Sequence, residues 1–276
     1  MTITTPSPTG HAVSADDTPI AYWASGEGPA LVVVHGAPAD HTRWRPLLPY
    51  LEPHFTVYAI DRRGRGASGD AAEYALEREF EDVAAVVDAV AARTGSAVRV
   101  YGHSHGGLVA FGGATLTSNI DRLVLYEGWP VTNPDAFILP PGLEERLDAL
   151  LESGDPDAVV EALFREVENL SDDDMAAFKA APSWPGRVAA APTLTRELRG
   201  MRTGRLDPGV ARTITVPVLL VTGEHSSDPT KPDVQAVAAA LPSARVLVLE
   251  GQEHVADVLD PEGFAARVAP FLQGRA

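Results

Sequence analysis

The 276-residue sequence predicts an α/β protein with a doubly wound, mainly parallel sheet of eight strands and a helical cap inserted after the sixth strand. Three observations predict this fold. Apolar runs of strand length alternate with helical patterns as far as residue 129, which is typical of a parallel sheet. Residues 130–210 show helical patterns only, and the alternation then returns. We therefore expect residues 1–129 and 211–276 to form one core, and residues 130–210 to form the cap.

The first strands are predicted from short apolar segments. "HAVSADD" and "IAYWASG" predict a hairpin with Asp16 and Asp17 in its turn. The segments "ALVVVHG" and "FTVYAID" are almost continuously apolar. Such segments are typical of strands that are covered by helices on both faces.

The next elements alternate as a doubly wound sheet requires. Between residues 76 and 90, apolar side chains recur at spacings of four and three, which predicts an amphipathic helix. "SAVRVYG" predicts a strand, residues 108–116 a helix and "DRLVLYE" a further strand. The chain thus reaches residue 129 with six strands assigned.

The cap and the C-terminal elements follow. The cap is rich in Ala, Leu and Glu, and one of its helices begins at "SDDDMAAF", where Ser171 can cap the helix and the aspartates suit its positive end. Afterwards "VPVLLVTG" and "ARVLVLEG" predict strands, and residues 234–241 and 261–272 predict helices. We expect the cap to cover the C-terminal edge of the sheet, where such folds bind ligands.

Composition and charge exclude several classes of function. There are no cysteines, so disulfides, thiolate metal sites and a cysteine nucleophile are excluded. The formal net charge of −16 opposes binding to nucleic acid or to an anionic membrane. No apolar run reaches the roughly 18 residues of a membrane span, and the first residues lack a secretory pattern. We expect a cytoplasmic protein that acts on a small molecule, needs no metal or organic cofactor, and could form a homodimer.

The segment "YGHSHGGL" presents a serine at the junction of a strand and a helix. Residues 102–106 fit G-x-S-x-G, the sharp strand-to-helix turn that exposes a nucleophilic hydroxyl. The predicted strand ends at Tyr101, and Gly106 and Gly107 would let the helix approach a neighbouring strand closely. Ser104 is therefore the predicted nucleophile. The alternative is a glycine-rich turn with an incidental serine.

A serine hydroxyl needs a base that removes its proton. His254 is the predicted base, because it lies in a loop between the last predicted strand and the last helix, which satisfies the chain order serine, acid, histidine. His103 and His105 are too close to Ser104 in sequence for that role. We expect them to line the pocket or to pack beneath the turn, and no further ligands support a His-x-His metal pair.

The developing oxyanion needs two backbone N–H donors. We expect these donors to be the amides of His105, directly after the nucleophile, and of Ala37, in the loop after "LVVVHG". Trp129 and His103 are candidates for contact with the substrate. The arginines of "DRRGRGAS" could attract an anion, but we favour a structural role in which they pair with Asp61.

Four segments together resemble the alpha/beta-hydrolase superfamily, in the branch with a serine nucleophile. They are "HGAP", "DRRGRGAS", "GHSHGG" and "GQEHVADVLDPEGF", and the resemblance covers about residues 11–272. It implies the alpha/beta-hydrolase fold with a variable cap. Epoxide hydrolases and haloalkane dehalogenases share the first segment but carry aspartate at the nucleophile position, so Ser104 argues against both activities.

The position of the catalytic acid departs from the family pattern. The family usually carries it three residues after the glycine of "VTGEHSSDP", where this chain has Ser226. Two alternatives are Asp228, in the same loop, and Glu127, which ends the strand "LVLYE". We favour Glu127, because a carboxylate that ends a buried strand is costly without a charged or hydrogen-bonded partner. A structural salt bridge or exposure to solvent would also explain Glu127.

The function expected from these residues is that of a serine hydrolase. Its substrate would be a small, largely apolar carboxylic ester or lactone, cleaved through an acyl-enzyme. Two alternatives stay open at the level of the sequence. One is a C–C bond hydrolase, or a non-hydrolytic cyclase or lyase of a biosynthetic pathway, and the other is a ligand-binding receptor on the same fold.

Overall fold

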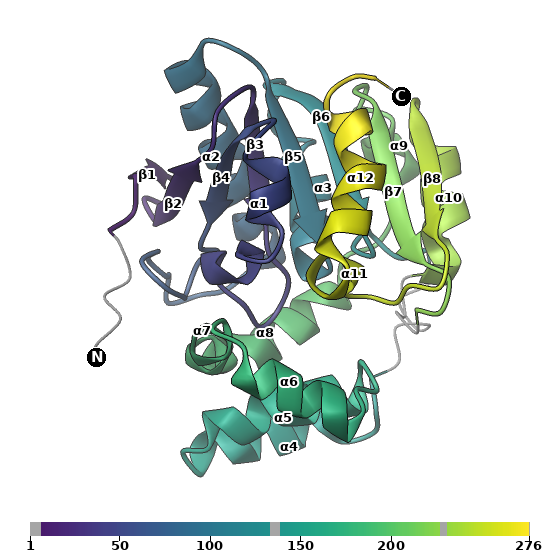
Figure 1. The fold of residues 1–276 in the computed structure, drawn as a ribbon. Coiled ribbons are helices and arrows are strands. Elements are labelled where there is room, and N and C mark those ends of the chain that lie inside the picture. Colours follow the sequence, from purple (N-terminus) through teal and green to yellow (C-terminus); the bar gives the residue numbers. More distant parts are fainter. Residues whose placement is uncertain (1–6, 133–138, 227–230, 276) are drawn as a thin grey trace.

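A computed structural model describes residues 7–132, 139–226 and 231–275 of the chain. Figure 1 shows a twisted sheet that is sandwiched between helices, with a separate group of helices below it. In the part of the chain that the structure describes, no helix is both long enough and apolar enough to span a membrane.

The sheet has eight strands, as the sequence predicts, in the order β1-β2-β4-β3-β5-β6-β7-β8. The hairpin of β1 and β2 is antiparallel and joins β4 in an antiparallel pairing, whereas all other neighbours are parallel. The strands are β1 (Gly10–Val13), β2 (Pro19–Ser25), β3 (Ala30–Val34), β4 (Thr56–Ile60), β5 (Val98–His103), β6 (Ile120–Tyr126), β7 (Val218–Gly223) and β8 (Ala244–Leu249).

Helices cover both faces of the sheet, which explains the continuous apolar runs. All five side chains of β3 are buried. Two clusters of buried side chains form the core, one on each face. One face is covered by α2 (Leu76–Thr94), α3 (His105–Gly113) and α10 (Val234–Ala240), and the other by α1 (Leu48–Leu51) and α12 (Pro261–Leu272).

Two helix boundaries differ from the prediction. α2 continues to Thr94, because its periodic apolar pattern ends only at Gly95, which adopts a left-handed conformation with φ of 68°. α3 begins at His105 instead of residue 108, since the chain turns directly from β5 into the helix at Ser104. The nucleophile candidate therefore immediately precedes the helix.

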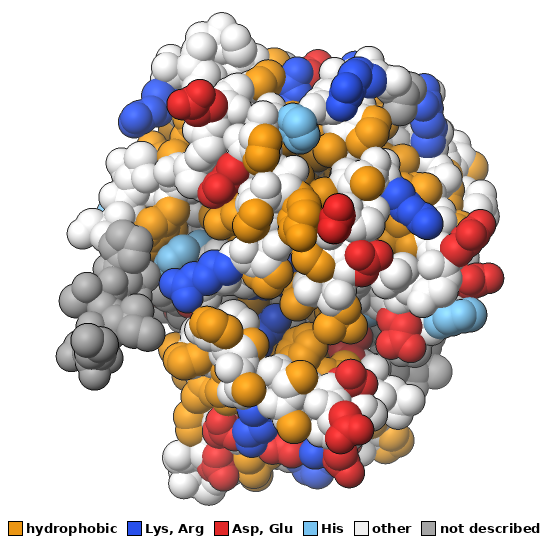
Figure 2. Space-filling view, in the orientation of Figure 1, with side chains coloured by type: hydrophobic (Ala, Val, Ile, Leu, Met, Phe, Trp, Pro, Cys, Tyr) orange, Lys and Arg blue, Asp and Glu red, His pale blue; other side chains and the backbone are white. Residues whose placement is uncertain are grey.

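The segment between β6 and β7 folds into helices with a small apolar core of their own. Exposed ion pairs such as Arg165–Glu161 and Lys179–Asp157 lie on the outside of this cap. Figure 2 shows charged side chains of both signs on its surface. The helices are α4 (Leu143–Glu152), α5 (Pro156–Glu166), α6 (Asp172–Ala180), α7 (Trp184–Ala189) and α8 (Ala191–Met201), followed by α9 (Pro208–Ala211).

The arginines of "DRRGRGAS" have a structural role, but their partners differ from the prediction. Arg62 binds Glu79 of α2, with Nε 2.6 Å from Oε2, and also Glu197 of the cap helix α8, at 3.0 Å. Asp61 instead accepts hydrogen bonds from the backbone N–H and the Nδ1 of His41, both at 2.8 Å. The expected pairing of Asp61 with the arginines is therefore wrong, because carboxylates from α2 and the cap neutralise them.

Candidate active site

Ser104 lies at the tip of the turn between β5 and α3, with φ of 54° and ψ of −132°. This conformation is uncommon for a residue other than glycine and marks a strained turn. The turn is fixed by backbone hydrogen bonds, from Ser104 N–H to the Tyr126 carbonyl at 2.8 Å and from Gly107 N–H to the Ser104 carbonyl at 2.7 Å.

The glycines around Ser104 permit a close approach of main chains. A Cβ at Gly106 would collide with the carbonyl oxygens of Val34 and His35 in the neighbouring strand and loop. A Cβ at Gly107 would collide with the backbone of Gly128. Because both obstacles are backbone atoms, no side-chain movement could relieve the contact, and α3 can pack here only with glycines.

His254 lies in the loop between β8 and α11 (Ala256–Leu259) and is 6% exposed. Its Nδ1 is 2.6 Å from Oε2 of Glu127. Its Nε2 is directed to the other side, toward the cap, where it is 3.9 Å from Oε1 of Glu168. The ring is thus held by a carboxylate at one nitrogen and presents the other nitrogen to the pocket.

Glu127 directly follows β6 and has φ of 45°. Its buried carboxylate accepts four hydrogen bonds. They come from Thr222 Oγ1 at 2.8 Å, Gly223 N–H at 2.7 Å, Ser226 Oγ at 2.6 Å and His254 Nδ1 at 2.6 Å. Burial alone would raise the pKa of Glu127, but the hydrogen bond and charge of His254, with help from Ser226 and Gly223, lower it. Glu127 is therefore ionised, and its orientation is fixed.

Ser226, at the position where the family usually carries an acid, donates a hydrogen bond to Glu127. Its hydroxyl supports the carboxylate that comes from β6. Asp228, the alternative acid, lies outside the described residues.

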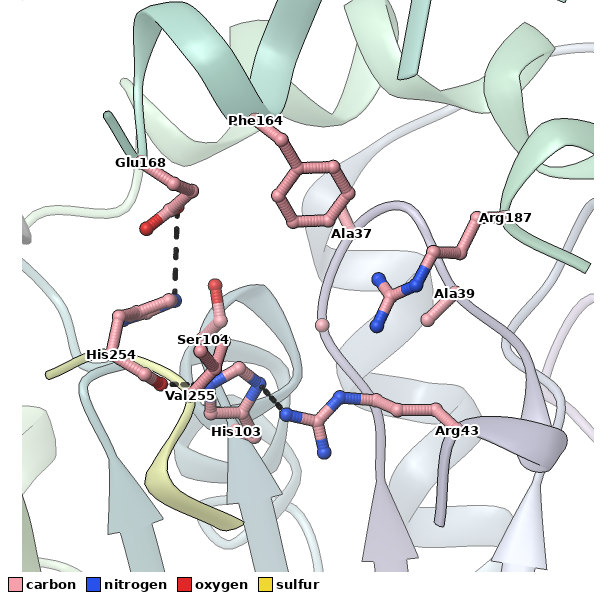
Figure 3. A pocket seen from close by; sticks show the side chains of 11 residues that line it. Ala37, Ala39, Arg43, His103, Ser104, Phe164, Glu168, Arg187, His254 and Val255 are labelled. Atoms are coloured by element: carbon pink, nitrogen blue, oxygen red, sulfur yellow. Dashed lines mark hydrogen bonds and ion pairs between the residues drawn. The ribbon is translucent and has the colours of Figure 1, made fainter. Parts of the chain in front are cut away.

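Ser104 and His254 line the same pocket, which has an empty volume of about 300 Å³. Figure 3 shows the Ser104 hydroxyl and the His254 ring pointing into this space from below, while cap residues close it from above. The remaining lining residues are Gly36, Ala37, Ala39, Arg43, His103, Phe164, Glu168, Arg187 and Val255.

The two expected oxyanion donors belong to two segments that adjoin Ser104. Ala37 belongs to the loop after β3 and lines the pocket. The neighbouring Gly36 packs so closely against Ser104 that a Cβ there would lie 2.9 Å from the Ser104 Cβ. His105 is the first residue of α3, and N–H groups in the first turn of a helix lack partners within the helix.

The two histidines beside Ser104 are buried and have different surroundings. His103 lines the pocket: its Nδ1 accepts from Arg43 Nη2 at 2.8 Å, and its Nε2 donates to the His254 carbonyl at 2.8 Å. Burial and the charge of Arg43 hold the pKa of His103 well below its usual value. His105 packs beneath the turn, 3.2 Å from Glu79, and burial lowers its pKa to about 4. Both rings are therefore neutral.

An ion pair that sequence reasoning missed supports the loop of His254. Arg43 binds Asp257 through two hydrogen bonds, of 2.7 and 2.9 Å, and Tyr101 OH donates to the same carboxylate at 2.7 Å. Burial would raise the pKa of Asp257, but the charge of Arg43 lowers it to about 2. No local pattern marks this pair, since Arg43 and Asp257 are 214 residues apart in sequence.

Trp129 is placed differently from the expected substrate contact. It is 1% exposed and belongs to the core cluster that also contains Leu108 of α3. It is not one of the residues that line the Ser104 pocket. The cap residues Phe164, Glu168 and Arg187 line the pocket instead, and nothing in their local sequence marked them.

Residues 7–132, 139–226 and 231–275 contain no group of three or more His, Asp or Glu side chains that could hold a metal ion.

Comparisons with known proteins agree with this architecture. The family model described as "Alpha/beta hydrolase family" matches residues 31–267. A structure of an alpha/beta hydrolase from Sphaerobacter thermophilus has 36% identity and a TM-score of 0.78, covering 95% of this chain and 99% of that one. A structure of a hydrolase from Pseudomonas aeruginosa has 26% identity and a TM-score of 0.76, covering 95% of this chain and 97% of that one.

A relative of known name is similar over most of its length. The 2-(acetamidomethylene)succinate hydrolase of Mesorhizobium japonicum is 26% identical over 256 residues, which are 90% of this chain and 89% of the relative. The family model matches most of the chain, and the sheet has eight strands. Both findings confirm the predicted fold, and the similar proteins confirm the prediction that this protein is a hydrolase. The chain belongs to the alpha/beta hydrolase family.

Proposed function

We propose that this protein is a serine hydrolase that cleaves a small carboxylic ester or lactone through an acyl-enzyme. The observation that carries the proposal is the hydrogen bond between His254 Nδ1 and Glu127, because it leaves Nε2 of the same ring facing the pocket of Ser104. A serine, a histidine base and an ionised carboxylate are the three groups that acyl transfer through serine requires.

The proposed reaction begins with attack of Ser104 Oγ on the substrate carbonyl carbon. His254 Nε2 accepts the hydroxyl proton, and Glu127 stabilises the resulting imidazolium. The backbone N–H groups of Ala37 and His105 donate to the oxyanion. The imidazolium then gives its proton to the departing alkoxide, and the acyl-enzyme remains.

Deacylation repeats these steps with water. His254 removes a proton from the water as it attacks the acyl carbon, and the same proton then returns to Ser104 Oγ as the carboxylic acid leaves. Because the same ring serves as base and acid in both halves, the loop that carries it must be held rigidly. The hydrogen bond of His103 to the His254 carbonyl supports this requirement.

The lining of the pocket supports a small substrate with an apolar body. The empty space between the lining residues is small, about 300 Å³ with the open solvent at its mouth included. Ala37, Ala39, Phe164 and Val255 contribute apolar surface. The name of the Mesorhizobium relative denotes hydrolysis of an acetamido compound, which supports cleavage of an acyl bond here too.

The proposal is tested by measuring hydrolysis of para-nitrophenyl esters of increasing acyl length, and of simple lactones, by the wild-type protein and Ser104→Ala. We expect turnover that falls as the acyl chain outgrows the pocket and that is abolished in Ser104→Ala. Turnover of a substrate by C–C bond cleavage or by cyclisation, without any ester hydrolysis, would favour the alternative functions of a C–C hydrolase or a cyclase. Micromolar binding of esters without turnover would instead favour a receptor.

A further inference from the structure

Arg187 of the cap helix α7 extends toward the pocket that contains Ser104. It is 5% exposed and lines that pocket. Figure 3 shows its guanidinium group pointing away from the cap backbone into the space between Phe164 and the Ala37–Ala39 loop. A cationic group of the cap thus faces the same cavity as the proposed nucleophile.

The charge of Arg187 has no carboxylate partner among the described residues. One nitrogen, Nη1, donates to the Pro38 carbonyl at 2.9 Å. The guanidinium carbon lies 5.1 Å from the ring centre of Phe164 and 5.3 Å from that of Phe178. Burial, together with the nearby charge of Arg43, lowers the pKa of Arg187 to about 9. The charges of Asp40 and Asp257 favour the charged form of Arg187, but neither carboxylate forms an ion pair with it.

Arg43 offers a direct comparison within the same pocket. It is also buried, but two hydrogen bonds to Asp257 neutralise its charge. A buried charge without a partner is costly, and a guanidinium has five N–H donors in a geometry that matches a carboxylate. Unlike Arg43, Arg187 forms no ion pair with the described residues, which leaves its guanidinium available to an anion in the pocket.

We propose that Arg187 binds a carboxylate group of the substrate, so that the enzyme acts on small esters or lactones that carry one carboxylate besides the scissile bond. This inference rests on the proposed function of Ser104. It narrows the expected substrate from a largely apolar compound to one with an apolar body and a single anionic end.

The other charged group of the cap lining sets the orientation of the substrate. Glu168 lies near Nε2 of His254, at 3.9 Å, and its negative charge disfavours a second anion at that end. The carboxylate of the substrate therefore lies on the Arg187 side of the pocket. The reacting carbonyl lies between this anchor and His254, over Ser104.

The experiment compares esters of matched shape that differ in charge. Monoethyl succinate carries the carboxylate in its acyl part, and ethyl isocaproate replaces that group by an isopropyl group. Acetoxyacetate and isobutyl acetate form the same pair with the charge in the alcohol part. The readout is the ratio of kcat/KM for the anionic ester to that for its neutral partner, measured by product release.

We expect the wild-type protein to prefer the anionic member of at least one pair. Arg187→Met should reduce that preference by roughly 10- to 100-fold, the usual effect of losing a charge-assisted hydrogen-bond pair. Arg187→Lys keeps a charge but not the forked geometry, so its kcat/KM ratio should lie between those of the wild type and Arg187→Met. Arg199→Met is the control, because Arg199 is an exposed cap residue that pairs with Glu144 and Asp148, and its ratio should equal that of the wild type.

A second measurement needs no variant and therefore does not depend on the folding of Arg187→Met. Butyrate, which carries a single carboxylate, should inhibit the wild-type hydrolysis of para-nitrophenyl acetate competitively, whereas butyramide, of the same shape but neutral, should not. The inference is overturned if the wild type shows no anionic preference and butyrate does not inhibit, while neutral esters are still cleaved in a manner that requires Ser104. Absence of all Ser104-dependent ester cleavage would overturn the proposed function itself.

Discussion

Glu127 and His254 are 127 residues apart in sequence, and the Oε2 of one lies 2.6 Å from the Nδ1 of the other. Glu127 directly follows β6, and Ser104 directly follows β5. These two strands are neighbours in the sheet. Three further donors come from the end of β7, at Thr222 and Gly223, and from the loop after it, at Ser226. The proposed acid is therefore held in part by the loop where the family usually carries this residue.

Replacement of Glu127 by glutamine tests its role as the acid. The amide can donate a hydrogen bond to His254 and favour the wrong tautomer, so we expect kcat to fall by about 10³- to 10⁴-fold. The measurement is steady-state ester hydrolysis, with the free energy of unfolding compared by urea titration.

Two matched variants control this prediction. Ser226→Ala removes one of the four hydrogen bonds but leaves the carboxylate, and it should lower kcat by about 10-fold or less. If Asp228→Asn abolishes turnover while Glu127→Gln retains it, at equal stability, Glu127 is not the acid.

His103 is expected to act as a positioning residue, because it joins Arg43 to the carbonyl of His254. His103→Leu should lower kcat by roughly 10- to 100-fold through displacement of the His254 loop. His103→Gln, whose amide can both accept from Arg43 and donate to the carbonyl, should recover part of this loss.

The pH dependence of these variants distinguishes positioning from proton transfer. The pKa of His103 lies well below its usual value, so the ring stays neutral where the enzyme is assayed. The shape of the pH–kcat profile should therefore be the same for His103→Gln and the wild type. Loss of an ionisation from the profile of His103→Gln would show that His103 itself exchanges a proton during turnover.

Asp257 should make stability depend on pH under acidic conditions. Its pKa is lowered from its ordinary value of 3.8 to about 2 in the folded protein, so its full contribution to stability is present above the pKa of the unfolded chain. That contribution, on the order of 2 kcal/mol, is lost as the pH falls from about 4 toward 2. The free energy of unfolding of the wild type should therefore approach that of Asp257→Asn across this interval.

The exposed Asp173, in the first turn of α6, is the matched control for Asp257. Asp173→Asn should leave the acid dependence of unfolding close to that of the wild type. A constant difference between the wild type and Asp257→Asn throughout the acidic range would contradict the assigned pKa.

Much of the fold and the centre of the candidate site can be predicted from sequence, for physical reasons. Continuous apolar strands and periodic helices specify the doubly wound sheet, and glycines around Ser104 specify the sharp turn. Glu127 could be singled out because an acidic side chain at the end of a buried strand demands a partner. Each of these signals lies within a short segment, so it can be recognised in a single sequence.

The remaining features depend on contacts between distant segments. Asp257 and Arg43 are separated by 214 residues, and neither segment indicates that the other is its partner. Arg187 belongs to a cap whose helices resemble any amphipathic helices in sequence. Its position over Ser104 follows only from the packing of the cap on the sheet edge, which no periodic pattern encodes.

The central claim is that His254 activates Ser104 as a nucleophile, and covalent labelling tests it most directly. The wild-type protein, His254→Ala and Ser104→Ala would be treated with a fluorophosphonate, and the modified peptide would be identified by mass spectrometry. We expect one adduct, on Ser104, and we expect none in Ser104→Ala. The adduct should form at least about 10²-fold faster in the wild type than in His254→Ala. Equal labelling rates with and without His254, or an adduct on another residue, would contradict the central claim.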